Sequence, residues 1–224
     1  MTFCIAARCA DTGIFGVAVS SSSPAVAARC AYARAGVGAV SSQNVTDPTL
    51  GPRALDLMER GASADEAVAI LKRTAAHIDY RQLLVVDALG RTAVHSGGQV
   101  LGRWGEATAE NVACGGNLLA DEGVPQAMVA GFQAATGPLG DRLLAAMQAA
   151  LDAGGEAGPV HSAGLKLVRD VSWPVADLRV DWSDGDPIAE LQALWRRYAP
   201  QMDDYVRRAL DPSAAPSYGV PGDE

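Results

Sequence analysis

The sequence predicts an α+β fold, a four-layer αββα sandwich in which two antiparallel sheets pack face to face under outer layers of helices. Segments typical of strands and helices follow one another as strands, helix pair, strands, helix pair, strands and helix. The strands come as hairpins, which build antiparallel sheets. Amphipathic helices can then cover the outer faces of two packed sheets. A single sheet with helices on one face is the competing arrangement.

The predicted strands are short apolar or alternating segments bounded by turn residues. In the last of them Leu178, Val180 and Trp182 alternate with charged residues, which indicates one buried face. Turns at 10–13 and 87–90 close two hairpins. The strands are expected at 2–9, 14–21, 37–43, 81–86, 91–97, 112–118, 161–169 and 176–182.

The predicted helices are recognised by apolar stripes and by their end signals. Ser63, with Glu66 three residues later, forms a capping box ahead of the second helix. Asp186 and Pro187 begin the last helix, and Pro200 is expected to break or kink it. The apolar stripes place the other helices at 50–58, 124–132 and 139–151.

The chain is expected to form one domain over residues 1–211. Its 224 residues suit one large domain, and they show no internal repeat and no interdomain linker. Residues 212–224 consist mainly of Pro, Ser, Gly and acidic residues, which predicts a disordered tail.

Composition excludes several classes of partner. A formal net charge of −8 argues against nucleic-acid binding, which needs a basic surface. No apolar run approaches the roughly 20 residues that span a bilayer, and the first ten residues lack a signal peptide's apolar core. The sequence therefore predicts a cytoplasmic protein without membrane partners.

Metal and cofactor chemistry have no sequence support. The three histidines have no carboxylate at helical ligand spacing, so no metal site is expected. No Walker or Rossmann phosphate loop and no Gly-x-Ser-x-Gly elbow occur, so no cofactor is expected. The four cysteines show no C-x-x-C spacing and are expected to be buried, reduced thiols.

Thr2 is the candidate catalytic nucleophile. Removal of Met1 would leave Thr2 with a free α-amine, whose ordinary pKa of roughly 8 lets it accept the proton of its own hydroxyl. If the first hairpin turns near 11–12, cross-strand partners sum to about 23 in residue number, so Thr2 faces Ser21 or its neighbours. Ser21 is therefore the candidate that orients the amine by hydrogen bonding. Alternatively, the serine run only ends a strand and Thr2 is an ordinary N-terminal residue.

Several separated blocks of the sequence together resemble the family called domain of unknown function 1028. The likeness covers roughly residues 2–195 and is carried by residues 1–8, 16–21, 35–40, 51–53, 81–82, 85–87, 95–97, 116–117, 177–181 and 186–188. That family resembles N-terminal-nucleophile hydrolases, which share the αββα sandwich. The resemblance implies this fold for the domain and cleavage of an amide-type bond in a small molecule or short peptide.

The sequence departs from the proteasome branch of that superfamily. There an acid on the second strand and a lysine on the third support the nucleophile. Here Ser20–Ser22 occupy the second strand's end, and the third strand offers Ser41, Ser42 and Gln43 but no lysine. A proteasome-like mechanism is therefore not expected.

Six further residues are candidate site residues. Arg81 would bind a substrate carboxylate, and the predicted hairpin brings it close to His95 and Ser96. Gln43 and Asn44, at the third strand's end, would contact a substrate amide. Alternatively, Arg81 is a surface arginine or forms an ion pair, His95 packs in the sheet, and Gln43 and Asn44 cap the strand. Asn117, after two glycines, would donate to an oxyanion; the glycines alternatively make only a turn or bulge.

Two other interpretations of the function stay open. The first is a non-catalytic protein that binds small molecules on the same fold. The second uses an internal cysteine, Cys4 or Cys114, as the nucleophile, although neither has an evident histidine partner. A homodimer is compatible with the expected exposed sheet edges and helical faces.

Overall fold

The computed structural model describes residues 2–223, and its strands form two antiparallel sheets. The six-stranded sheet has the order β10 (Ala176–Val180), β9 (Ser162–Val168), β2 (Phe15–Ser21), β1 (Thr2–Arg8), β8 (Val112–Asn117) and β7 (Trp104–Ala109). The four-stranded sheet has the order β3 (Ala31–Arg34), β4 (Gly38–Asn44), β5 (Arg81–Asp87) and β6 (Thr92–Ser96). The sheets pack face to face, chiefly through β1 against β4, β2 against β3 and β8 against β5.

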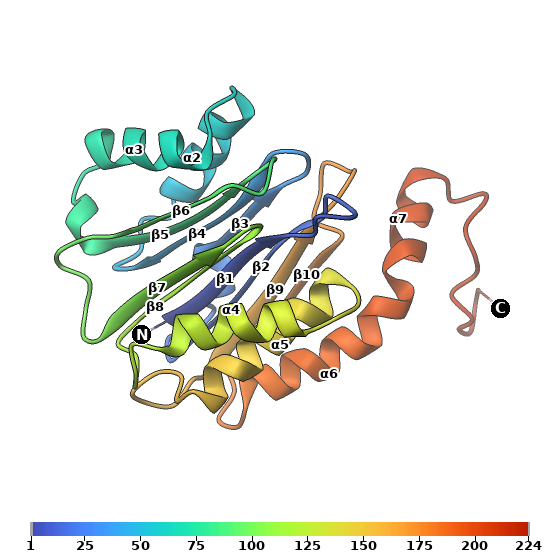
Figure 1. Ribbon diagram of the computed structural model, residues 1–224. Coiled ribbons are helices and arrows are strands. Elements are labelled where there is room, and N and C mark those ends of the chain that lie inside the picture. Colours follow the sequence, from blue (N-terminus) through green and yellow to red (C-terminus); the bar gives the residue numbers. More distant parts are fainter. Residues whose placement is uncertain (1, 224) are drawn as a thin grey trace.

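Helices cover both outer faces of this pair of sheets (Figure 1). The smaller sheet is covered by α2 (Leu50–Glu59) and α3 (Ala64–Thr74), and the larger one by α4 (Val124–Ala134), α5 (Leu139–Asp152) and α6 (Pro187–Tyr198). Short connections include α1 (Ala27–Cys30), η1 (Ile78–Tyr80) and η2 (Ala199–Gln201), and α7 (Met202–Leu210) is the last helix described. The predicted four-layer αββα sandwich is confirmed, and the single-sheet alternative is wrong.

The alternation of side chains along β1 separates the two halves of the core. Phe3 and Ile5 pack in the cluster formed with α4, α5 and α6, whereas Cys4 and Ala6 pack between the two sheets. Because side chains alternate along a strand, Thr2 shares the inter-sheet side of β1 with Cys4. The first described residue of the chain therefore directs its side chain into the space between the sheets.

Local signals set the helix ends. Ser63 accepts from the Glu66 N–H while the Glu66 carboxylate accepts from the Ser63 N–H, so the predicted capping box is confirmed. Asp186 accepts from the N–H groups of Ile188 and Ala189 at the start of α6. The predicted interruption at Pro200 is confirmed, because η2 separates α6 from α7.

Two strands, β3 and β7, were not predicted from the sequence. Both are edge strands, so each pairs with only one neighbour. The segment Trp104–Ala109 contains Gly105 and Glu106 and shows no strict apolar alternation. Its place in the sheet depends on pairing with β8, a contact that local patterning does not reveal.

The segment after α7 lies beside that helix. Arg208 donates to the carbonyls of Pro216 and Ser217, and its guanidinium lies 3.9 Å from the centre of the Tyr218 ring. The disorder of residues 212–224 stays a prediction, and Glu224 lies outside the described residues, as does Met1. Between residues 2 and 223, no helix has the length and apolar character that crossing a bilayer requires.

Candidate active site at the start of the first strand

Thr2 and Ser21 meet at one end of the larger sheet. The register pairs Phe3 with Ser20, so partner numbers sum to 23 as predicted. The Thr2 hydroxyl donates to Ser21 Oγ at 3.4 Å, and Ser21 Oγ also accepts from the Ser23 N–H at 3.1 Å. Both side chains are buried, with Thr2 6% exposed. The predicted contact between Thr2 and Ser21 is therefore confirmed.

Glu156 is a buried carboxyl that the sequence analysis missed. It lies in the connection between α5 and β9, and its two carboxylate oxygens accept from the Ser22 N–H at 3.3 and 3.2 Å. Glu156 also forms a β-bridge with Leu119, just beyond β8. Because β1 lies between β2 and β8, this residue spans the start of β1, where Thr2 lies.

The environment of Glu156 makes it an unusual acid. Burial raises the pKa of its carboxyl from 4.5 to about 7, against the opposing effect of the hydrogen bond from the Ser22 N–H. Such a group can exchange a proton near neutral pH. The only local sign in the sequence is the Gly154–Gly155 turn before it, which gives no hint of the long-range contact with Ser22.

Buried amides link the two sheets close to Thr2. Gln43 Nε2 donates to Gln82 Oε1 at 2.7 Å and to the Gly115 carbonyl at 3.2 Å. Asn117, the cross-strand partner of Thr2, donates from Nδ2 to the same Gln82 Oε1 at 3.3 Å. Gln43 therefore contacts this amide network, and its proposed contact with a substrate amide stays a prediction.

Gly115 and Gly116 lie inside β8, with continuous pairing and no bulge. A Cβ on Gly116 would lie 2.6 Å from Leu119 Cδ2 and 3.1 Å from the Thr2 carbonyl oxygen. Glycine is therefore needed for close packing at this point. The turn-or-bulge interpretation of these glycines is therefore wrong.

Ser96 joins the amide network from β6. It faces Gln82 in the strand register, accepts from Gln82 Nε2 at 2.9 Å and donates to Glu106 Oε2 at 2.7 Å. Ser96 is thus linked to Thr2 only through Gln82 and Asn117. A direct contact between Ser96 and a substrate stays a prediction.

The structure does not bring Arg81 and His95 to Thr2. His95 faces Leu83, which packs against α2 and α3, so both lie on the outer side of the smaller sheet. Arg81 precedes Leu83 by two residues and shares that side. The His95 ring lies 3.3 Å from the Ile78 carbonyl, and Arg81 donates to the Val45 carbonyl. These contacts tether loops, in keeping with the structural interpretation.

Asn44 also holds loops in place. Its Nδ2 donates to the Tyr80 carbonyl at 2.6 Å, and its Oδ1 accepts from the Leu101 N–H at 3.3 Å. With φ at +76°, Asn44 adopts the left-handed conformation that asparagine tolerates better than most residues. The side chain is therefore engaged in holding two loops at the end of β4.

The four cysteines are free and buried, as predicted. Burial raises the pKa of Cys4 and Cys114 above the ordinary thiol value. A thiol with a raised pKa forms little of the nucleophilic thiolate, so a cysteine nucleophile has no support here. Within residues 2–223, no group of three or more His, Cys, Asp or Glu is placed to hold a metal ion.

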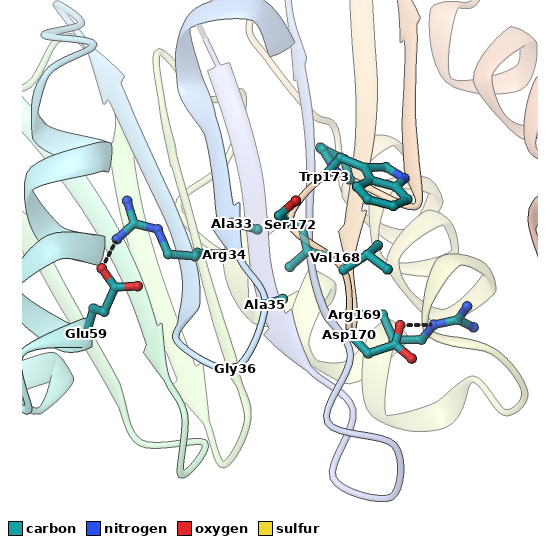
Figure 2. A pocket seen from close by; sticks show the side chains of 12 residues that line it. Ala33, Arg34, Ala35, Gly36, Glu59, Val168, Arg169, Asp170, Ser172 and Trp173 are labelled. Carbon is teal, nitrogen blue, oxygen red and sulfur yellow. Dashed lines mark hydrogen bonds and ion pairs between the residues drawn. The ribbon is translucent and has the colours of Figure 1, made fainter. Parts of the chain in front are cut away.

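A cavity of about 680 Å³ lies at the opposite end of the sandwich (Figure 2). There Arg34 pairs with Gly38 and Val168 with Phe15, far along the strands from Thr2. Arg34 is neutralised by Asp56 and Glu59, and the other guanidinium in the wall, Arg169, by Asp170 and Asp203. The cavity is thus walled by charges that already have partners.

Residues 2–191 match the model of a family of unknown function, DUF1028. Protein SPO2555 from Silicibacter pomeroyi, a crystal structure described as belonging to the same family, is 28% identical to the chain. Its match covers 91% of this chain and 94% of that chain, with a TM-score of 0.83. A comparison with curated proteins found no significant match.

Two Anbu structures are more distant. Anbu (ancestral beta-subunit) from Yersinia bercovieri is 12% identical, with 91% of this chain and 97% of that one covered and a TM-score of 0.39. The Anbu (Gly-1) mutant from Hyphomicrobium sp. strain MC1 is also 12% identical, with 98% and 100% covered and a TM-score of 0.45. Similarity at these TM-scores does not establish a shared function.

Proposed function

The chain belongs to the family of unknown function DUF1028, and we propose that it is an N-terminal-nucleophile amidohydrolase with Thr2 as its nucleophile. The proposed substrate is an amide-type bond in a small molecule or short peptide. One observation carries the proposal: the Thr2 hydroxyl contacts Ser21 at the start of β1, between the strands that the buried Glu156 connects.

The proposed reaction begins with loss of Met1, which gives Thr2 a free α-amine. This amine accepts the hydroxyl proton as Thr2 Oγ1 attacks the substrate carbonyl carbon. The C–N bond then breaks, the departing nitrogen takes that proton, and the acyl group is left as an ester on Thr2. A water molecule hydrolyses the ester, which releases the acid and restores the hydroxyl.

Neighbouring groups have distinct parts in this proposal. Ser21 Oγ, which already accepts from Thr2 Oγ1, orients the hydroxyl and the new amine. Glu156, whose pKa is raised by burial to about 7, balances the charge of a protonated amine or exchanges a proton with it. One N–H of the Asn117 amide goes to Gln82, so the second can donate to the oxyanion.

The burial of Thr2 supports a second candidate function, small-molecule binding without catalysis. Thr2 is only 6% exposed, and the cavity of about 680 Å³ lies at the far end of the sandwich. On this alternative the chain would keep Met1, and changes at Thr2 would leave ligand binding unaltered.

Turnover by a chain that begins at Thr2 tests the proposal. A panel of amides, ureides and dipeptides would be screened by the release of ammonia or amine. We expect Thr2→Ala to fold but lose turnover by roughly a thousandfold or more, whereas Thr2→Ser keeps part of it. The control Thr12→Ala changes an exposed turn residue and should leave turnover unaltered. Full activity in Thr2→Ala would refute the assignment.

A further inference from the structure

The orientation of the buried Gln82 amide is fixed by backbone carbonyls. Its Nε2 lies 3.3 Å from the Gly105 oxygen and 3.2 Å from the Gly116 oxygen. Carbonyl oxygens only accept hydrogen bonds, so this end of the amide must be the N–H₂ group. The other end, Oε1, is therefore an acceptor that faces Gln43 and Asn117.

This orientation determines how Asn117 is placed. Because Gln82 presents an oxygen, Asn117 must present its Nδ2, which leaves Asn117 Oδ1 as the outward end of the amide. Asn117 is 1% exposed, and its Oδ1 has no hydrogen-bond partner among residues 2–223. A buried carbonyl oxygen without a donor is destabilising and is rare in folded proteins.

The backbone of Thr2 points at the same residue. The Ser21 carbonyl accepts from the His161 N–H, so the backbone groups of Ser21 face β9. Those of Ser20 then face β1, where Ser20 pairs with Phe3. By the same alternation Phe3 faces β2 and Thr2 faces β8, so the Thr2 nitrogen is directed toward its partner Asn117.

We infer that Asn117 Oδ1 is the acceptor for an N–H of the Thr2 α-amine once Met1 is removed, and that Gln82 is the positioning residue that keeps this oxygen turned toward Thr2. The inference rests on the proposed function, because only the processed chain carries that amine. An amide nitrogen inside the chain has a single N–H, whereas a terminal amine has two or three to donate. The additional N–H of the α-amine would donate to Asn117 Oδ1, the acceptor that has no partner in the amide network.

The contact has a definite role in the reaction. An amine that donates one N–H to Asn117 can rotate less, so its lone pair stays directed toward the Thr2 hydroxyl. The same contact favours the protonated amine, since a hydrogen bond to a charged group is stronger than one to a neutral group.

Several other ionisable groups surround this amine. Glu156 spans the strand start from the connection before β9, and Cys4 lies on the same side of β1. Glu106 is linked to the amide network through Ser96. His161 lies directly before β9, with its ring stacked on Trp182 at 4.3 Å. The test must therefore compare variants in which all of these groups are retained.

The pKa of the α-amine is the quantity to measure. The chain that begins at Thr2, released from a cleavable N-terminal fusion, would be acetylated at a series of pH values, and the N-terminal peptide quantified by mass spectrometry. We expect Asn117→Leu to lower the pKa of the amine by about one unit. Gln82→Met should lower it in the same direction, because Asn117 then loses the partner that orients it. Asn117→Asp, which keeps an acceptor and adds negative charge, should raise it.

Ser96→Ala is the matched control. It removes one partner of Gln82 but leaves both glycine carbonyls in place, so the amine pKa should not change. An unchanged pKa in Asn117→Leu would overturn the inference; should that variant not fold, an unchanged pKa in Asn117→Asp would do the same. Because this titration needs no substrate, its failure is distinguishable from an active Thr2→Ala variant, which would refute the proposed function.

Discussion

The two ends of the sandwich deal with polar groups in opposite ways. At the Thr2 end, amides, hydroxyls and the Glu156 carboxyl are buried and bonded mainly to one another and to backbone groups. At the other end the cavity of about 680 Å³ is walled by arginines that are partly exposed and paired with carboxylates. The Thr2 end holds buried polar groups in fixed positions, whereas the other end is an open cavity at the surface.

Cavity volume alone is therefore a poor guide to a functional site. Burying polar groups is destabilising unless each has a partner. A fold that buries many of them at one place must therefore hold them in a fixed hydrogen-bonded arrangement. The far cavity needs no such arrangement, since solvent can satisfy its charges. We therefore attribute the proposed chemistry to the Thr2 end.

The largest expected effect on stability is at Gln82. Gln82→Met removes the donor to three acceptors and the acceptor of two donors, all in the buried network. We expect the free energy of unfolding to fall by about 2–4 kcal/mol, because each buried group left without a partner costs about 1–3 kcal/mol. Urea unfolding followed by circular dichroism measures this loss.

A variant at the far end of the sandwich provides the comparison for that experiment. Arg34→Gln breaks the ion pairs with Asp56 and Glu59 at the rim of the cavity. These pairs are partly exposed, so the loss should stay below about 1 kcal/mol. Equal losses in the two variants would contradict the contrast between the ends.

The effect expected from the titration of Glu156 is somewhat smaller than that of Gln82→Met. Its pKa is raised by burial from 4.5 to about 7 in the folded chain, so the folded chain binds this proton more tightly than the unfolded chain does. The stability that this proton contributes is complete below about pH 4.5 and is lost as the pH rises through about 7. The loss should reach at most about 3 kcal/mol.

The measurement is the free energy of unfolding between pH 4.5 and pH 8 in the parent chain and in Glu156→Gln. The variant should lack this part of the pH dependence, because glutamine does not titrate. The control Glu122→Gln changes an exposed glutamate and should keep it. Identical pH profiles in all three chains would show that Glu156 ionises normally.

Sequence patterns predicted the architecture well because it depends on local signals. The hairpin turns, the Ser63 capping box and the alternation of apolar and charged residues in β10 each lie within a few residues of the element they define. Even the contact between Thr2 and Ser21 follows from one hairpin register. The edge strands β3 and β7 were missed because their pairing partners, not their own residues, make them strands.

The surroundings of the candidate site were harder to predict for a related reason. Glu156 reaches Ser22 across 134 positions, and Gln82 reaches the backbone of β7 and β8 from the other sheet. No spacing rule connects such residues. The grouping of Arg81 with the site followed from its hairpin register alone, which does not tell on which side of the sheet a side chain lies.

The most direct test of the central claim is the mass of the N-terminal peptide after treatment with a β-lactone, an electrophile that acylates hydroxyl nucleophiles. Protein purified without an N-terminal tag would be treated, digested and analysed by tandem mass spectrometry. We expect a peptide that begins at Thr2 and carries the acyl group on that residue. A peptide that begins at Met1, or an acyl group confined to other residues, would contradict it.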